Sequence, residues 1–204
     1  MKAAISHKTP KYSFEIEAYY RITVVSSVRV EKERFSALCK DHCRNFNRKY
    51  SCPPSSNDFH NLSCGYDFLH VFLNLVRLDT FPQIYNTIRM VNTVLKGKQR
   101  KLTDSISEKL SEKHTPHTIL ENGSCRLCKT CAFQFVEPCK HPEKMRFSLE
   151  ATGVDVNDLC SSCFGIPLQW YRKGAFPAYQ GVVSAILCNT NSDIVKPEAL
   201  LSLP

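Results

Sequence analysis

The feature that most limits how this chain can fold is a run of cysteines, Cys125, Cys128 and Cys131, in which two residues separate each cysteine from the next. A cubane iron–sulfur cluster presents its irons at the corners of a tetrahedron, so one tight loop with this spacing can reach three of them. A zinc site rarely needs such a run, because two Cys-x2-Cys pairs from separate segments complete its tetrahedron. The spacing therefore favours a [4Fe-4S] cluster, and zinc is the alternative.

The candidate for the fourth ligand of this group is Cys139. Seven residues separate it from Cys131, and Lys140 follows it. The bacterial ferredoxin run instead has a gap of three residues and a proline after its last cysteine. Because of this departure, Cys139 is a candidate rather than a ligand fixed by the spacing.

A second group of cysteines comes earlier in the chain, with Cys39, Cys43 and Cys52 followed by Cys64. On a helix, a spacing of four places Cys39 and Cys43 on one face. Two prolines directly after Cys52 restrict the backbone there and can hold its sulfur toward that helix. These cysteines predict a second metal site. The alternative is that the helical pair is simply small, buried and apolar.

The number of ligands in this second site is open. If Cys64 joins, four thiolates complete it. If Cys64 does not join, three thiolates leave one position for water, a substrate or a distant ligand such as His42 or His60. A further pair, Cys160 and Cys163, could supply remote ligands, a dithiol or nothing.

The expected compartment decides how eleven cysteines are interpreted. No apolar stretch approaches the roughly 18 residues that cross a bilayer, and the N-terminus lacks the apolar core of a signal peptide. We therefore expect a cytoplasmic protein, in which clustered thiols bind metal more often than they form disulfides. No two glycines lie closer than seven residues, which excludes phosphate loops of the Rossmann and P-loop types.

The formal net charge is +8 with neutral cysteines. Thiolates that hold a cluster would offset part of it, because an oxidised [4Fe-4S] cluster with four thiolates carries roughly −2. Outside one basic run at 96–101 the cations are scattered, so nucleic-acid binding is disfavoured. Cations close to both cysteine groups suggest docking to an acidic redox protein or to a reductase or oxidoreductase subunit. These cations are Lys40, Arg44, Arg48, Lys49, Arg126, Lys129 and Lys140.

Hydrophobic patterning predicts the first half of the fold. One or two strands are expected over 13–30, a short helix over 31–42, and a buried strand over 66–79. Apolar residues at helical spacing predict a helix over 84–95 that ends at Gly97. A second helix is expected from Ser105, where Ser105 and Glu108 form a capping box.

The second half of the chain is less regular. We expect an irregular segment over 123–142, a helix within 144–163 interrupted at Gly153, and strands over 166–188 with a turn near Gly174 and Pro177. The predicted class is α+β, with a mixed or antiparallel sheet, helices on one side, and a ferredoxin-like, cysteine-rich loop region. One compact domain is expected, with portions at 1–122, at 123–188 and, as a loosely ordered tail, at 189–204.

With these residues in hand, the chain resembles a family of predicted metal-binding proteins, the domain of unknown function 2284. The resemblance covers roughly residues 20–188 and is carried by FSALCKDHCRNFNRKYSCPP, by the segment from Gly123 to Val156, and by GIPLQW. Asn47 stands where the family suggests glycine, and Tyr50 where it suggests tryptophan. The resemblance implies a cytoplasmic protein, often from anaerobes, with seven family cysteines: Cys39, Cys43, Cys52, Cys125, Cys128, Cys131 and Cys139.

The family label supplies no reaction. The residues favour an electron carrier or electron-delivery subunit with one or two [4Fe-4S] clusters over an enzyme. One alternative is an enzyme that uses a three-cysteine cluster as a reductive or Lewis-acid centre. The other is an interaction module stabilised by zinc.

Overall fold

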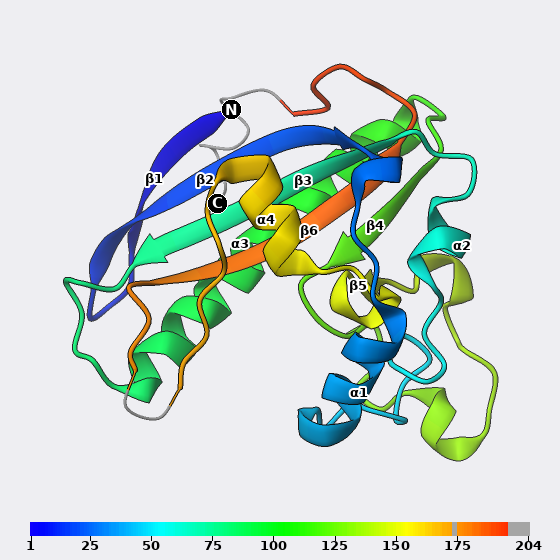
Figure 1. The fold of residues 1–204 in the computed structure, drawn as a ribbon, viewed down its shortest axis with the longest axis horizontal. Coiled ribbons are helices and arrows are strands. Elements are labelled where there is room, and N and C mark those ends of the chain that lie inside the picture. Colours follow the sequence, from blue (N-terminus) through cyan, green and yellow to red (C-terminus); the bar gives the residue numbers. More distant parts are fainter. Residues whose placement is uncertain (173–174, 196–204) are drawn as a thin grey trace.

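The computed structural model describes residues 1–172 and 175–195. Within them, six strands form one sheet in the order β1-β2-β3-β6-β4-β5 (Figure 1). The strands are β1 (Lys2–Lys8), β2 (Ser13–Val24), β3 (Phe68–Arg77), β4 (His117–Glu121), β5 (Phe147–Ser148) and β6 (Tyr179–Cys188). The α-helices are α1 (Lys32–His42), α2 (Phe59–Ser63), α3 (Tyr85–Glu112) and α4 (Val156–Phe164). No helix in these ranges has the length and apolar character needed to cross a membrane.

The sheet is mixed, as the predicted α+β class allows. Neighbouring strands are antiparallel except for β4 and β5, which run parallel. The late strand β6 lies between β3 and β4, with Phe68 opposite Cys188 and His117 opposite the same cysteine. The sheet therefore combines strands from distant parts of the chain.

Helices cover both faces of this sheet, so the prediction of helices on one side was wrong. The buried strand predicted over 66–79 is confirmed as β3, and its side chains pack on both faces. Phe72 and Val76 join the apolar cluster beneath α3, whereas Leu69, Val71 and Leu73 join the cluster beneath α4. A central strand that is apolar on both faces needs cover on both.

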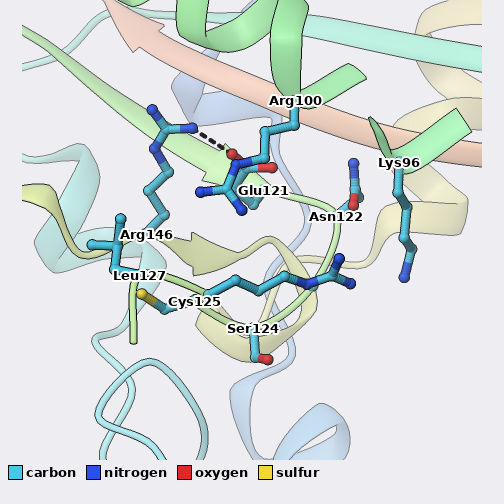
Figure 2. A pocket seen from close by; sticks show the side chains of 10 residues that line it. Lys96, Arg100, Glu121, Asn122, Ser124, Cys125, Leu127 and Arg146 are labelled. Atoms are coloured by element: carbon cyan, nitrogen blue, oxygen red, sulfur yellow. Dashed lines mark hydrogen bonds and ion pairs between the residues drawn. The ribbon is translucent and has the colours of Figure 1, made fainter. Parts of the chain in front are cut away.

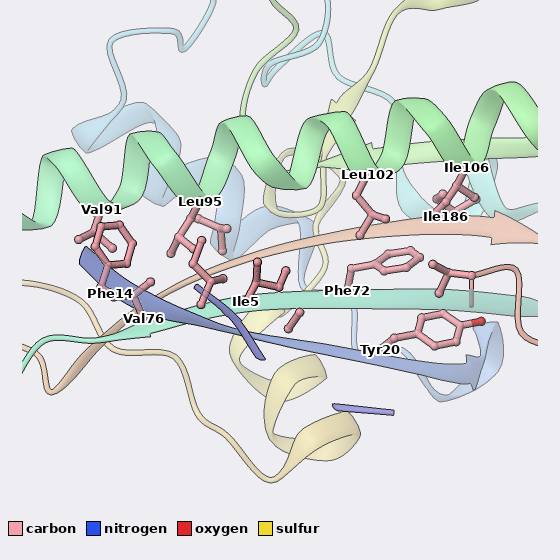
Figure 3. Close-up of a cluster of buried hydrophobic side chains, with 14 of the residues drawn as sticks. Ile5, Phe14, Tyr20, Phe72, Val76, Val91, Leu95, Leu102, Ile106 and Ile186 are labelled. Atoms are coloured by element: carbon pink, nitrogen blue, oxygen red, sulfur yellow. The ribbon is translucent and has the colours of Figure 1, made fainter. Parts of the chain in front are cut away.

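Helix α3 is continuous through Gly97, so the two predicted helices are one helix of 28 residues. Its buried face includes Leu95 before the glycine and Leu102 and Ile106 after it, all packed on the sheet (Figure 3). A glycine inside a helix costs only about 1 kcal/mol relative to alanine, and burial of each large apolar side chain outweighs that. The expected capping box at Ser105 does not form, because this residue lies inside the helix.

A buried polar contact also ties the middle of α3 to the sheet. Gln99 is fully buried, and its side-chain nitrogen donates to the Phe72 carbonyl and to the Ser184 hydroxyl, each at 2.8 Å. These bonds form two residues beyond Gly97. They add a further reason for the helix to continue rather than end there.

The pairing of β1, β2 and β3 is reinforced at one edge by Glu17. This carboxylate accepts hydrogen bonds from the Tyr19 hydroxyl, from Lys2 at 2.9 Å and from Arg77 at 2.9 Å. Burial raises the pKa of Glu17, but the three donated bonds outweigh that effect and lower the pKa to about 2.

At the other end of the sheet, His70 is buried between two hydrogen-bond partners. Its Nε2 lies 2.9 Å from the Thr190 carbonyl, so Nε2 must carry the proton and donate. Its Nδ1 then accepts from the Tyr20 hydroxyl at 2.7 Å. Burial lowers the pKa of His70, which keeps the ring neutral.

Other expectations were met in part. The helix predicted over 31–42 is confirmed as α1, and 13–30 contains one long strand, β2. The region 166–188 contains one strand, β6, and the turn predicted at Gly174 lies outside the described residues. Within 144–163 only the second part is α-helical, because Gly153 adopts φ 96°. Strands β1 and β4 were not predicted, and most of the expected tail, 196–204, also lies outside the described residues.

Candidate metal centre

The cysteine run lies in the long connection between β4 and β5. This connection contains only two short 3-10 turns, at Ala132–Phe135 and Pro142–Lys144. Its four cysteines line a single small cavity, together with residues 49–51 of the earlier group and His141. They are Cys125, Cys128, Cys131 and Cys139, all half-buried. The structure thus brings the run and its candidate fourth member to one place.

The loop that carries Cys139 back to this cavity is shaped by a turn at Val136. Val136 adopts the left-handed conformation with φ 58°, and Glu137 N donates to the Ala132 carbonyl at 3.2 Å. Tyr50 stabilises this turn through two contacts. Its hydroxyl donates to the Glu137 carbonyl at 2.7 Å, and its ring meets that of Phe133 at a centroid distance of 5.0 Å.

The first cysteine group is built around the end of α1. Cys43 follows the helix, and its backbone N–H donates to the Cys39 carbonyl at 3.0 Å. Successive turns then return the chain, and Asn47 N donates to the Pro53 carbonyl at 2.8 Å. Asn47 has φ 50°, a left-handed conformation that asparagine tolerates better than most residues. This geometry explains why glycine is expected at the same position.

The thiols of this group interact electrostatically. Burial raises the pKa of Cys52 to about 11, and the neighbouring Cys43 and Cys39 raise it further against the opposing effects of Ser51 and Lys49. Burial also raises the pKa of Cys39, and Cys43 adds to that rise. These three cysteines lie in one folded segment, closed by the backbone bond from Asn47 to Pro53.

The two cysteine groups lie side by side, joined by residues 49–51. Lys49 donates from Nζ to the Ser124 hydroxyl at 3.1 Å and to the Cys125 carbonyl at 2.8 Å. Cys125 N in turn donates to the Ser51 hydroxyl at 3.1 Å. The same segment that leads into Cys52 thus forms a wall of the cavity around the cysteine run. Sequence reasoning missed these contacts, because the partners are more than 70 residues apart.

With this arrangement described, the chain can be compared with known proteins. Residues 22–187 match the family described as predicted metal-binding protein, DUF2284. The chain belongs to this family. The match includes both cysteine groups and extends from the end of β2 through most of β6. No curated protein and no solved structure matches the chain.

The remaining cysteines stand apart from both groups. Cys64 is exposed at the end of α2. Cys160 and Cys163 are buried on α4 within the apolar cluster, and burial raises the pKa of both thiols. Cys188 is buried in β6. The buried surroundings of Cys160, Cys163 and Cys188 fit the role of packing residues.

The donor chemistry of the site can be tested against the metals that the family description implies. Thiolate sets suit zinc or iron–sulfur clusters, and the cavity of the cysteine run is lined by four cysteines and His141 with no Asp or Glu among its lining residues. Across residues 1–172 and 175–195, no three His, Cys, Asp or Glu side chains surround one ion-sized point. Cys125, Cys128, Cys131 and Cys139 around the cavity are the residues that would hold a thiolate-bound metal or cluster.

Proposed function

We propose that this protein binds [4Fe-4S] clusters through its two cysteine groups and transfers electrons. The observation that carries the proposal is that one cavity is lined by the three cysteines of the run and by Cys139, the candidate for the fourth ligand. These residues would hold one cluster, and Cys39, Cys43 and Cys52 would hold a second metal centre. A [4Fe-4S] cluster supplies reversible one-electron oxidation and reduction.

The spacing of the run supports iron–sulfur over zinc. Three cysteines at successive Cys-x2-Cys intervals suit the separated corners of a cubane, whereas a zinc ion needs four donors around one point. The wall formed by Lys49, Tyr50 and Ser51 supports a buried centre, because it covers the cavity with hydrogen-bonded side chains. The ammonium of Lys49 also favours the thiolate form of nearby cysteines.

The contact between the two groups supports a role in passing electrons. Residues 49–51 touch the cysteine run, and Cys52 belongs to the other group, so centres in both groups would be close neighbours. Such neighbours allow an electron that enters at one group to leave at the other. The protein would then connect a donor and an acceptor.

Exposed cations around the cysteine groups support an acidic redox partner, such as a reductase or oxidoreductase subunit. They include Lys40, Arg44, Arg48, Lys129 and Lys140. Charges of this kind steer association and are screened by salt over about 10 Å at 0.1 M ionic strength. Electron transfer to such a partner should slow as ionic strength rises, and a rate independent of salt would exclude this docking mode.

The site assignment is tested by iron content in cysteine variants purified without oxygen. Cys128→Ser should remove the iron of one cluster, because a corner of that cluster loses its thiolate. Cys188→Ser is the matched control, since Cys188 is buried in β6 away from both groups. It should keep the iron content of the wild type. Equal iron in both variants would contradict the assignment.

A second candidate function is an enzyme with an open iron site. The observation that favours it is that Cys39, Cys43 and Cys52 lie in one folded segment around the end of α1, whereas Cys64 lies at the end of α2. Three thiolates leave one iron free to bind a substrate. For this function, Cys64→Ala should leave iron content unchanged, whereas Cys52→Ala should lower it. A small added ligand should also shift the magnetic resonance spectrum of the cluster.

A further inference from the structure

A second cavity lies directly beside the cysteine cavity, between α3 and the loop that follows β4 (Figure 2). Cys125 and Leu127 line both cavities. In Figure 2, Lys96 and Arg100 extend from α3 toward the loop that carries Asn122. The volume of the cavity is about 30 Å³. This is far below the range of about 300 to 1,000 Å³ for sites that enclose a whole small molecule, so only a compact group, no larger than a single oxyanion, could enter it.

The walls of this cavity carry more positive than negative charge. Four of the lining residues are cationic, namely Lys96, Arg100, Arg126 and Arg146, and Glu121 is the acidic one. Arg146 already binds Glu121 and Asp104, each at 2.6 Å, and Arg100 lies 3.9 Å from Asp104.

The other two cations have no such partner. Within the described part of the chain, neither Lys96 nor Arg126 forms an ion pair. Burial lowers the pKa of Lys96, and the charge of Arg126 lowers it further, while Glu150 offsets this only in part. The ammonium is thus held near a like charge in a half-buried position, where an anion would stabilise it.

An unpaired hydrogen-bond donor lies in the same wall. The side-chain nitrogen of Asn122 is buried and has no hydrogen-bond partner among the residues that the structure describes. Buried donors are almost always paired with protein or water, so one that lies against a cavity indicates an acceptor from outside the chain, either water or a ligand oxygen. Two cations without counter-charges and one amide without an acceptor select the same kind of ligand.

We propose that this cavity binds the oxyanion of a small molecule, a phosphate or a carboxylate, through Lys96, Arg126 and the amide of Asn122. A lysine supplies a compact charge, and an arginine supplies a planar pair of donors that matches either oxyanion. Because Cys125 lines both cavities, the bound anion lies beside the cysteine cavity. The proposal does not depend on which metal, if any, the cysteines hold.

Calorimetric titration of the purified protein, as loaded with its metal, tests this proposal. Inorganic phosphate and acetate are titrated separately, with sodium chloride holding the ionic strength constant. Saturable binding is expected for at least one of them, and the stronger one identifies the oxyanion class. Lys96→Gln should weaken binding about tenfold or more, since hydrogen bonds to charged groups are the stronger kind. Lys109→Gln removes an exposed charge from the same helix and should bind as the wild type does.

Two further variants keep the test decisive if Lys96→Gln fails to fold. Arg126→Gln should weaken binding as Lys96→Gln does, and Asn122→Ala should weaken it several-fold because only a neutral donor is lost. No binding of either anion to the wild type would overturn the proposal. Equal binding by the cavity variants and Lys109→Gln would also overturn it. Metal content measured on the same samples separates this result from the proposed function, because anion binding survives a change of metal.

Discussion

The continuity of α3 through Gly97 determines whether an alanine at this position raises or lowers the free energy of unfolding. Gly97 lies inside this helix, is exposed, and would place an added Cβ in open space with no atom within 4 Å. Alanine is favoured over glycine in a helix interior by about 1 kcal/mol. Gly97→Ala should therefore raise the free energy of unfolding by about 1 kcal/mol. For a chain of this size that is about 2–4 °C in Tm.

The opposite result is expected if the helix ended at Gly97, as the sequence pattern predicted. A glycine that ends a helix usually adopts the left-handed conformation, where an alanine costs about 1–2 kcal/mol. Gly153 provides the control, because it does adopt φ 96° and an added Cβ would lie 2.8 Å from the Lys32 Cα. Gly153→Ala should lower the free energy of unfolding by at least about 1 kcal/mol.

Urea unfolding followed by far-ultraviolet circular dichroism measures both effects. The midpoint and slope are compared at constant pH and metal content, since an unchanged slope shows that only stability has changed. A lower midpoint for Gly97→Ala would refute the continuous helix. An unchanged midpoint for Gly153→Ala would refute the close contact between this turn and α1.

Three further predictions concern polar and charged side chains with defined partners. Burial lowers the pKa of His70 below its unfolded value of 6.5. The stability that the neutral ring contributes is therefore present above pH 6.5 and is lost on acidification, by up to about 1.4 kcal/mol per pH unit. Urea unfolding at pH 7 and pH 5 should show this loss for the wild type and not for His70→Gln. Glu17→Gln should lower the free energy of unfolding by about 1–2 kcal/mol at pH 7, a value reduced because the basic partners of Glu17 are half-exposed. This loss should shrink as pH falls from 4.5 toward 2, where the native carboxylate is protonated. A constant loss in unfolding experiments across that range would exclude an ionic role. Lys49→Met should lower metal content, because it removes the bonds to Ser124 and Cys125, and Lys113→Met on the protein surface should not.

Local signals in the sequence were strong enough to predict several elements. The buried strand β3 was predictable because its apolar run, interrupted by His70 and Asn74, suits a strand covered on both faces. Helix α1 was predicted over the right residues, but the prediction that Cys39 and Cys43 share one of its faces was wrong, because α1 ends at His42 and Cys43 adopts an extended conformation after it. The turn after Cys52 was predictable from the two prolines there. The cysteine groups were evident because metal binding depends on residue type and spacing, which a sequence displays directly.

The missed features depend on contacts between distant segments. Gly97 predicted a helix end by its local preference, but burial of Leu95 and Leu102 and the bonds of Gln99 outweigh that preference. The helical layer on the second face of the sheet was missed for a similar reason, because no local pattern shows that α4 packs on the face opposite α3. The bonds of Lys49 to the cysteine loop likewise join residues that no spacing pattern connects.

The central claim is that the cysteine groups hold iron–sulfur clusters, and metal analysis of the wild-type protein tests it most directly. The protein is purified without oxygen, and iron, acid-labile sulfide and zinc are measured per chain, with magnetic resonance spectra recorded after reduction. The account predicts iron and sulfide in equal amounts, about four of each per cluster, with a cluster spectrum that appears on reduction. Zinc without sulfide, or a chain that binds no metal, would contradict it.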